Sequence, residues 1–401
     1  MVLWTRLAPQ PLAEDGHGGM SLDPVTVHWE VCADPDFRGR SFRGKALAQA
    51  ELAHSVHPKV TGLDPQTEYW YRFRVGRTTS PVGRFRTLPA PGSSPESFSF
   101  ATTTCQAWYH GHYAVQRHIA AEKELDLVFF LGDYIYEYGI NAGNHWREGS
   151  TVTDAHRYET ETLEQYRLRY SLTKSDPNLQ SLHARCAAVV TWDDHEVQND
   201  YARHTSAYGI PAELFVHRIA VAYRAFYENM PIDVTALPEG TAADLTDELE
   251  IGDLASFSVL DTRQFRDPKP VDLEEQYRPA RTMLGTEQEA WVTRRLAASK
   301  ATWNVLANGI TVSRITENRV DQWDGYPAAR QLLLEAMAAS RNCVVLTGDT
   351  HRHTASELRR NFDDPTVEGN VGVELICSSA TSDGDGAPTD NLPRTGCSTT
   401  G

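Results

Sequence analysis

Apolar and polar positions alternate along two early segments, residues 25–31 and 69–75, as they do in β-strands with one buried face. Between these segments, Gly-Leu-Asp-Pro at residues 62–65 is a turn signal. Short strands joined by Gly/Pro turns favour a small sandwich of the immunoglobulin or fibronectin type. We therefore expect an all-β domain over residues 1–88, followed by a Pro- and Ser-rich linker at residues 89–97.

From residue 98 the pattern changes to continuous apolar runs separated by segments with helical periodicity. This alternation predicts a two-layer or three-layer α/β domain over residues 98–386, with β-sheet layers flanked by helices. The expected strands are residues 98–103, 125–131, 187–192, 255–260, 303–307, 343–347 and 371–378. The expected helices are residues 112–124, 161–171, 217–229, 286–299 and 328–340. Residues 387–401 show no periodicity and are expected to be a disordered or aberrant tail.

Reactive or ionisable side chains follow five of these apolar runs. They are Cys105 after the first, Asp133 and Tyr136 after the second, Asp194, His195 and Glu196 after the third, Asp261 and Arg263 after the fourth, and Asp349, His351 and His353 after the sixth. Because the carboxyl ends of strands in one sheet meet at one edge, we expect a single shared site there. A site with this many carboxylates needs cations to be stable.

The residue types at this site indicate two kinds of metal ligand. A redox-capable or trivalent transition metal would suit Cys105, Asp133, Tyr136 and His351. Asp194 and Asp349 offer oxygen donors for calcium, magnesium or manganese, and Asp133 is the expected bridge between the two ions. In such a centre one ion generates hydroxide while the other clamps an ester oxygen. The simpler alternatives are that Cys105 is a buried thiol and that Tyr136 is a core aromatic residue.

Four further residues are candidates for roles around the metals. His195 directly follows Asp194, a position that suits a general acid better than a ligand, although an exposed loop histidine is the alternative. The forked guanidinium of Arg263 would clamp a phosphate group, whereas the alternative is a structural ion pair with Asp261. Two supporting residues that would orient the ligands are Glu196 and His353.

Composition and charge narrow the class of protein. The 401 residues carry 38 basic and 54 acidic side chains, a formal charge of −16, which argues against nucleic acid as a specific partner. No segment has the apolar length of a transmembrane helix, and no export signal is visible. The six cysteines lack metal-ribbon spacing, and neither a phosphate-binding glycine loop nor a serine-hydrolase motif is present.

With these motifs the chain resembles the alkaline phosphatase D (PhoD-like) family of calcineurin-like metallophosphatases. The resemblance covers nearly the whole chain, including residues 2–6 and 69–71 of the expected β-sandwich. In the second domain it lies in residues 104–106, 132–139, 192–197, 260–264, 323–327 and 346–351. It implies a calcineurin-like layered core preceded by the family's N-terminal β-sandwich domain.

The resemblance also implies the chemistry of the site. A ferric ion would be held by Cys105, Asp133, Tyr136 and His351, and calcium by Asp133, Asp194 and Asp349, with magnesium, manganese or zinc possible in their place. Asn308 lies near where relatives supply another ligand, though the match is loose. His195 and Arg263 would act as catalytic and substrate-binding residues.

The implied activity is hydrolysis of phosphate mono- or diesters by a metal-bound hydroxide, on small phosphate esters or phospholipid head groups. The implied location is secreted or periplasmic. Two alternatives remain: a phospholipase D-type phosphodiesterase that uses the same centre, and a non-catalytic binding protein stabilised by cations.

Overall fold

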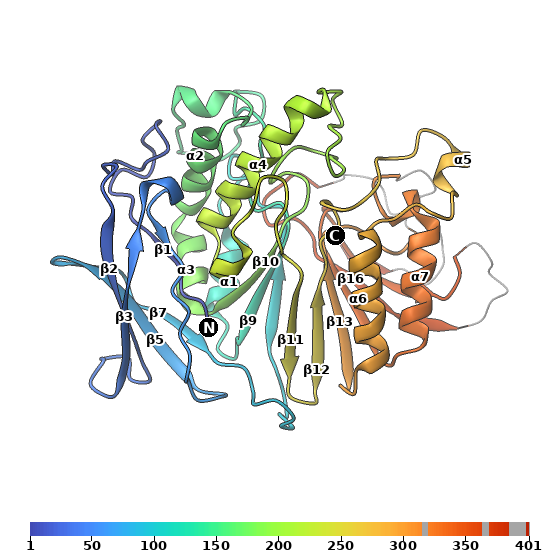
Figure 1. Cartoon of the computed structure of the whole chain (residues 1–401), viewed down its shortest axis with the longest axis horizontal. Coiled ribbons are helices and arrows are strands. Elements are labelled where there is room, and N and C mark those ends of the chain that lie inside the picture. Colours follow the sequence, from blue (N-terminus) through green and yellow to red (C-terminus); the bar gives the residue numbers. More distant parts are fainter. Residues whose placement is uncertain (315–319, 363–368, 385–397, 401) are drawn as a thin grey trace.

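The computed structural model describes residues 1–314, 320–362 and 369–384, together with the backbone of β17 (Ser398–Thr400). Figure 1 shows the β-rich N-terminal part at one end of the molecule, drawn in blue. Next to it lie helices α1–α4, then two sheets in the centre, and helices α6 and α7 at the other end.

The N-terminal part is built from antiparallel strands. Its larger sheet has the order β3, β2, β5 and β6, with β7 paired to β5, and a second sheet pairs β1 with β4. A core that includes Leu3, Val27 and Tyr69 joins the two sheets. The strands predicted over residues 25–31 and 69–75 are confirmed as β2 and β5. The bounds are Thr5–Arg6 (β1), Val25–Cys32 (β2), Ser41–Ala48 (β3), Ser55–Val56 (β4), Glu68–Val75 (β5), Thr78–Thr79 (β6) and Gly83–Arg86 (β7).

Two sheets form the centre of the molecule. The first is a parallel sheet of order β10, β9, β8, and the second has the order β11, β12, β13, β14, β16, β15, β17. In the second sheet β12, β13, β14 and β16 are parallel, and β11, β15 and β17 are antiparallel to their neighbours. The bounds are Phe100–Thr103 (β8), Leu127–Leu131 (β9), Ala187–Thr191 (β10), Asp247–Ile251 (β11), Ala255–Val259 (β12), Trp303–Asn308 (β13), Cys343–Thr347 (β14), His353–Arg359 (β15) and Asn370–Ile376 (β16).

Helices cover the outer faces of both sheets. The bounds are Ala114–Ala121 (α1), Leu163–Lys174 (α2), Pro177–Arg185 (α3), Ala212–Asn229 (α4), Leu273–Gln276 (α5), Gly285–Ala298 (α6) and Pro327–Ala338 (α7). The five helices predicted from the sequence are confirmed as α1, α2, α4, α6 and α7. Among the described residues, no helix combines the length and apolar character that crossing a membrane requires.

The strand β9 shows how the layers are held together. Leu127, Phe129 and Leu131 face the second sheet in a core shared with Phe257 and Val305. The alternate residues Val128 and Phe130 face the other way and pack with helices α1–α4. This alternation is what a strand buried on both faces requires, and it explains the continuous apolar run in the sequence.

The part of the chain that follows the N-terminal strands thus has four layers, in the order helices, sheet, sheet and helices. The sequence predicted two or three layers. The sequence did not reveal that its apolar strands belong to two sheets, because strand patterns do not specify strand partners. Most of the predicted tail, residues 385–397 and 401, lies outside the described residues. Ser398–Thr400 correct the tail prediction, because they form β17, paired with β15.

The contact between the sheets generates a first prediction. The ring of Phe129 stacks on Phe257 with a centroid separation of 5.1 Å, and both side chains are fully buried. Phe129→Ala should lower the free energy of unfolding by about 3–5 kcal/mol, since it leaves a cavity between the layers. Urea unfolding measures this, with Phe265→Ala as the control because that ring is 40% exposed. Equal effects of the two substitutions would contradict the assignment of this core.

Candidate metal centre

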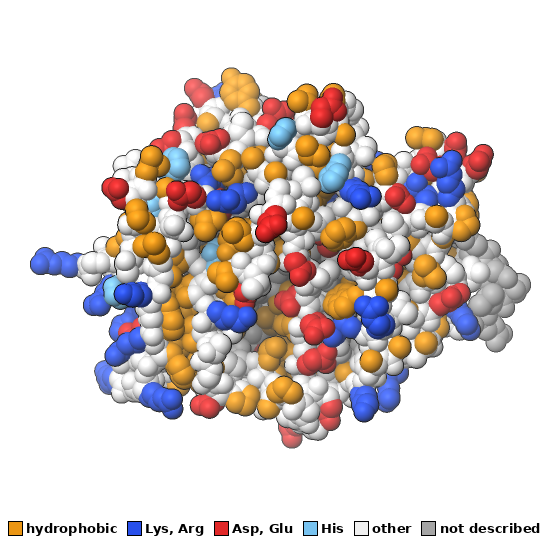
Figure 2. All heavy atoms as spheres, viewed as in Figure 1, with side chains coloured by type: hydrophobic (Ala, Val, Ile, Leu, Met, Phe, Trp, Pro, Cys, Tyr) orange, Lys and Arg blue, Asp and Glu red, His pale blue; other side chains and the backbone are white. Residues whose placement is uncertain are grey.

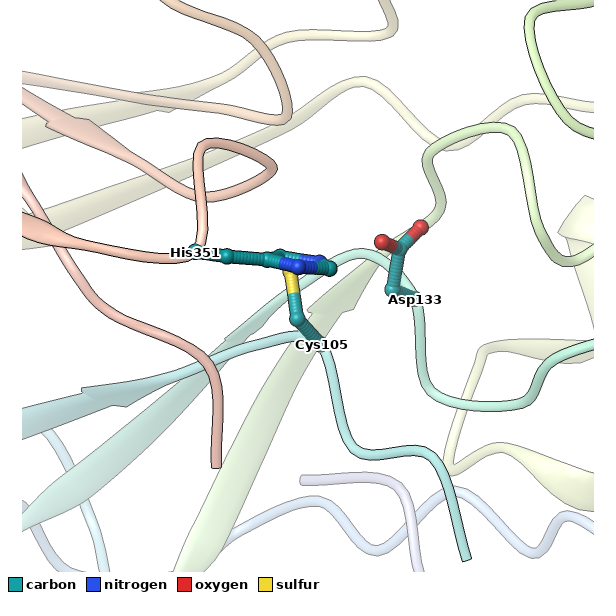
Figure 3. Close-up of side chains that lie close together, drawn as sticks. All are labelled: Cys105, Asp133 and His351. Carbon is teal, nitrogen blue, oxygen red and sulfur yellow. The ribbon is translucent and has the colours of Figure 1, made fainter. Parts of the chain in front are cut away.

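The loops that follow four strands bring the predicted ligands together. Cys105 follows β8, Asp133 follows β9 and Asp194 follows β10, so these residues leave the first sheet at one edge. Asp349 and His351 follow β14 of the second sheet. The ligand atoms of Cys105, Asp133 and His351 all lie within 4.8 Å of one another, as Figure 3 illustrates.

Tyr136 completes this first group. Its hydroxyl donates to Oδ2 of Asp133 at 3.1 Å and lies 3.1 Å from Nε2 of His351. Nδ1 of His351 lies 2.7 Å from the carbonyl oxygen of Asp383, an arrangement in which Nδ1 carries the proton and Nε2 can bind a metal. A thiol, a phenol, a carboxylate and an imidazole thus lie together, and side chains of these types can bind a transition metal.

A second group of carboxylates overlaps the first. Asp133 also lies within 4.8 Å of Asp194 and His195, and Asp194 in turn forms such groups with Asp193 and Asp349 and with Asp200 and Asp321. Asp133 is therefore common to the group with Cys105 and His351 and to the group with Asp194 and His195, and Asp194 links the latter to the two all-carboxylate groups.

Four of the predicted ligands have left-handed backbone conformations. The φ angles are 52° for Cys105, 53° for Asp133, 62° for Asp349 and 52° for His351. Residues other than glycine rarely adopt positive φ, and such conformations cost free energy and concentrate at functional sites. The fold holds these four side chains in place against this cost.

Glu196 holds two of the ligand loops from behind. This fully buried carboxylate accepts hydrogen bonds from the backbone N–H groups of Asp133 at 3.2 Å, Tyr134 at 2.6 Å and Asp193 at 2.9 Å. One side chain thereby joins the loop after β9 to the loop after β10. The loops also touch at Gly132, where an added Cβ would lie 2.5 Å from the Cβ of Asp193.

The electrostatics of the centre favour cations. Burial, together with the charge of Asp133, raises the pKa of Cys105 and of Tyr136 well above their ordinary values. Burial and Asp194 raise the pKa of Asp349 to about 7. Burial is also the main reason that the pKa of Asp133 lies well above its ordinary value. Positive charge at this place would lower all four pKa values and so favour the deprotonated forms that bind metals.

One buried atom points to the same conclusion. Oδ1 of Asp133 is buried and has no hydrogen-bond partner among the described residues. A buried carboxylate oxygen without a partner is costly. The donor set, the overlapping groups and this oxygen together fit a pair of cations that share Asp133.

His195 is fixed by a residue that sequence analysis did not identify. Nδ1 of His195 lies 2.7 Å from Oε2 of Glu137, which is fully buried and also accepts from the backbone N–H of Asn199 at 2.7 Å. The His195 ring is 7% exposed and packs on Tyr136 at 4.1 Å between centroids. His195 is therefore held at the site and is not an exposed loop residue.

Arg263 differs from its expected place. Its guanidinium is fully buried, donates to both carboxylate oxygens of Asp193 at 2.6 and 3.1 Å, and lies 2.9 Å from Asp321. With its donors occupied, Arg263 is part of a structural ion pair and does not present a clamp for phosphate. Its partner is Asp193, whereas Asp261 accepts from the backbone N–H groups of Arg263 and Gln264.

Two other candidates form hydrogen bonds with neighbouring protein groups. His353 is exposed on β15 and its Nδ1 accepts from the backbone N–H of Ser378 at 3.2 Å. Asn308 is buried between Thr347, to which it donates at 2.9 Å, and Trp323, whose indole donates to it at 3.3 Å. Among the described residues, His353 belongs to none of the groups that could hold a metal ion.

Sequence analysis did not assign several residues that the structure places at the site. Asp193, Asp200 and Asp321 join the carboxylate groups, Gln322 donates to Asp349, and Asp383 orients His351. Asp193 stands directly beside Asp194, so the doubled acid at the strand end was the one available signal. The others lie in loops whose positions no periodic pattern determines.

Comparisons with known proteins agree with this fold and site. A family model described as PhoD-like phosphatase matches residues 100–398, and a model of the PhoD-like phosphatase N-terminal domain matches residues 1–89. The layered fold and acidic site are therefore those of a phosphatase, an enzyme that hydrolyses phosphate esters. The chain belongs to the PhoD-like phosphatase family, which confirms the resemblance seen in the sequence.

Two relatives cover most of the chain. Alkaline phosphatase D of Bacillus subtilis (strain 168) is 44% identical over 405 residues, which are 96% of this chain and 68% of that protein. The solved structure of PhoD matches with a TM-score of 0.88 and 43% identity, over 95% of this chain and 74% of that chain.

The contact at Gly132 generates a second prediction. Gly132→Ala should lower the free energy of unfolding by about 1–3 kcal/mol more than Gly76→Ala, because only the first places a methyl group against another loop. Both glycines have positive φ, 90° and 56°, but a Cβ at Gly76 would meet nothing within 4 Å. Thermal and urea unfolding measure the stability of the two variants. Equal losses of unfolding free energy would show that the contact at Gly132 does not determine the cost of the substitution.

Proposed function

We propose that this chain hydrolyses phosphate esters at a bimetallic centre carried by a calcineurin-like layered fold. Cys105, Asp133, Tyr136 and His351 would hold a ferric ion, and Asp133, Asp194 and Asp349 a calcium-type ion. The observation that carries this proposal is that Asp133 lies in one group with Cys105 and His351 and in a second with Asp194 and His195, while its Oδ1 has no partner among the described residues. Asp194 in turn lies in a group with Asp349. When bound, two such cations acidify water and neutralise the charge of a phosphate ester.

The chain's own residues would do the remaining work. Because Nδ1 of His195 faces Glu137, its Nε2 is the nitrogen available to donate a proton to the leaving oxygen. Glu137 fixes the orientation of the ring and acts through His195, so it is a positioning residue. Arg263 has the same kind of role, since it holds Asp193 and Asp194 in place without contacting substrate.

Assays on three substrates distinguish a hydrolase of simple phosphate esters from a phospholipase D-type phosphodiesterase. Activity is measured on p-nitrophenyl phosphate, on its bis-ester and on phosphatidylcholine. We expect hydrolysis of the simple mono- or diester. Hydrolysis of phosphatidylcholine alone would favour a phospholipase D-type enzyme on the same centre.

The ferric side generates a third prediction. Cys105→Ala should lower the iron content per chain at least about tenfold, because loss of a residue that merely supports a ligand already weakens metal binding by about 10–100-fold. Mass spectrometry of the metals, with phosphatase assays alongside, measures this. Cys343→Ala is the matched control, since that thiol is also buried but lies in β14 beside the carbonyl oxygen of Met337. Full iron content and full activity in Cys105→Ala would refute the ligand assignment.

Glu137 generates a fourth prediction. Glu137→Gln keeps the size of the side chain but removes the charge that faces His195, so kcat should fall at least about tenfold while KM changes little. Steady-state kinetics on p-nitrophenyl phosphate separate the two constants. Glu335→Gln, on the exposed face of α7, is the control. An unchanged kcat would show that Glu137 has only a structural role.

A further inference from the structure

Basic side chains gather on one face of the larger N-terminal sheet. Residues 1–89 carry 11 basic and 9 acidic side chains, whereas the whole chain carries 38 basic and 54 acidic ones. In Figure 2 blue Lys and Arg side chains gather over this part of the molecule, where Figure 1 labels the strands β2, β3 and β5. Positive charge is thus concentrated at one end of an acidic protein.

The strand register aligns two cations and an imidazole across this sheet. His28 of β2 lies opposite Lys45 of β3 and opposite Arg74 of β5. Because residues paired across a sheet point to the same side, the three side chains share one face. All three are exposed, and so is Arg77 in the turn between β5 and β6. Within the described ranges of the chain, Lys45, Arg74 and Arg77 form no ion pair.

The next row along the strands includes an acid. Glu30 of β2 accepts hydrogen bonds from Arg43 of β3 at 2.8 Å and from Arg72 of β5 at 3.0 Å. Two guanidinium groups therefore share one carboxylate, and this row also retains positive charge. We call the following set of side chains the basic face: Arg43, Lys45, Arg72, Arg74 and Arg77.

The opposite side of this sheet is buried. Val27 of β2 and Phe73 of β5 point to that side and pack with Leu3 and Val56 in the N-terminal core. The side chains of the basic face alternate with these core residues along the strands, so they point away from the core.

An apolar side chain lies beside the cations. Leu47 of β3 follows Lys45 by two residues and lies opposite Thr26, so it points to the same side of the sheet. Its side chain is 53% exposed. A large apolar side chain among cations gains free energy at a surface that is anionic outside and apolar beneath.

We propose that the basic face docks the protein on an anionic lipid bilayer, with its cations against the lipid head groups and Leu47 in the interfacial layer. The cations are spread over adjacent strands and a turn, so they match a charged plane, whereas a linear polyanion is bound along a groove. Salt screens charges beyond about 8 Å at physiological ionic strength, so the acidic groups at the far end of the molecule repel the bilayer only weakly. This docking surface is separate from the metal centre and does not rest on the proposed function.

Cosedimentation measures binding to vesicles of phosphatidylserine and phosphatidylcholine in equal amounts, with pure phosphatidylcholine vesicles as the net-neutral reference. Wild-type protein should bind the anionic vesicles at least about tenfold more tightly, and high salt should remove the difference. Each basic residue near an anionic membrane strengthens binding by roughly fivefold. The triple variant Lys45→Gln, Arg74→Gln and Arg77→Gln should therefore bind these vesicles on the order of a hundredfold more weakly.

A second triple variant is the matched control for net charge. Arg117→Gln, Arg294→Gln and Lys300→Gln remove the same charge at exposed positions in α1, in α6 and just after α6. This variant should bind the anionic vesicles as the wild type does. Equal binding of the wild type to both kinds of vesicle, or equal losses in the two triple variants, overturns the proposal.

Leu47→Gln separates a bilayer from a soluble polyanion. It should weaken binding to the anionic vesicles at least about threefold, because it removes an apolar side chain that the bilayer buries, and leave binding to heparin unchanged. Leu332→Gln, at a leucine of α7 that is 54% exposed, is the control and should not change vesicle binding.

Two other occupants of the basic face are outcomes of the same tests. Binding to heparin without binding to vesicles assigns the face to a soluble polyanion and overturns the proposal. Salt-dependent self-association without vesicle binding, measured by analytical ultracentrifugation, assigns it to a second copy of the chain and also overturns the proposal. None of these measurements uses phosphatase activity, so they separate failure of this inference from failure of the proposed function.

Discussion

The rest of this structure depends on one constraint, the negative charge that is buried where strands of the two sheets end. Asp133, Asp193, Asp194 and Asp349 stand together at strand ends, and Arg263 is the buried cation that pairs with part of that charge. Burial alone would raise the pKa of Asp194, but Arg263 and His195 hold it below its ordinary value. Asp349 and Asp133 lack equivalent compensation, and this imbalance is what two cations would remove.

Two buried glutamates stabilise the loops around this charge in the same way. Glu196 accepts backbone N–H groups from the loops after β9 and β10. In the second sheet, Glu374 of β16 accepts from the backbone N–H groups of Val312 and Ser313 after β13, at 2.8 Å each, and from the hydroxyl of Thr347 at 2.7 Å. Each carboxylate replaces several missing backbone partners at once, so irregular loops can be buried beside the site.

Much of the fold followed from burial on both faces of the central strands. Such strands give continuous apolar runs, and β9, β12 and β14 were predicted within a few residues. Strands β11 and β15 were not predicted, because many of their residues are exposed and polar and therefore interrupt any continuous apolar run. The candidate ligands could be predicted because each follows a buried strand, and the end of such a strand has a defined position in the fold.

The partners of those ligands did not follow from the sequence. Arg263 was predicted to clamp phosphate, with an ion pair to Asp261, two residues away, as the alternative. Its carboxylate partner is Asp193, which lies 70 positions earlier and follows a strand of the other sheet. Glu137 and Asp383 likewise act on His195 and His351 across long separations. Sequence patterns define a local period and a strand end, whereas these contacts depend on how two sheets are docked.

The division of the site between the two sheets has a consequence for folding. Tyr136 and His351 are 215 positions apart, and the group of Cys105, Asp133 and His351 takes residues from both sheets. Such a centre forms late, after the loop-closure entropy of a long chain has been overcome. Metal affinity would then report docking of the two sheets.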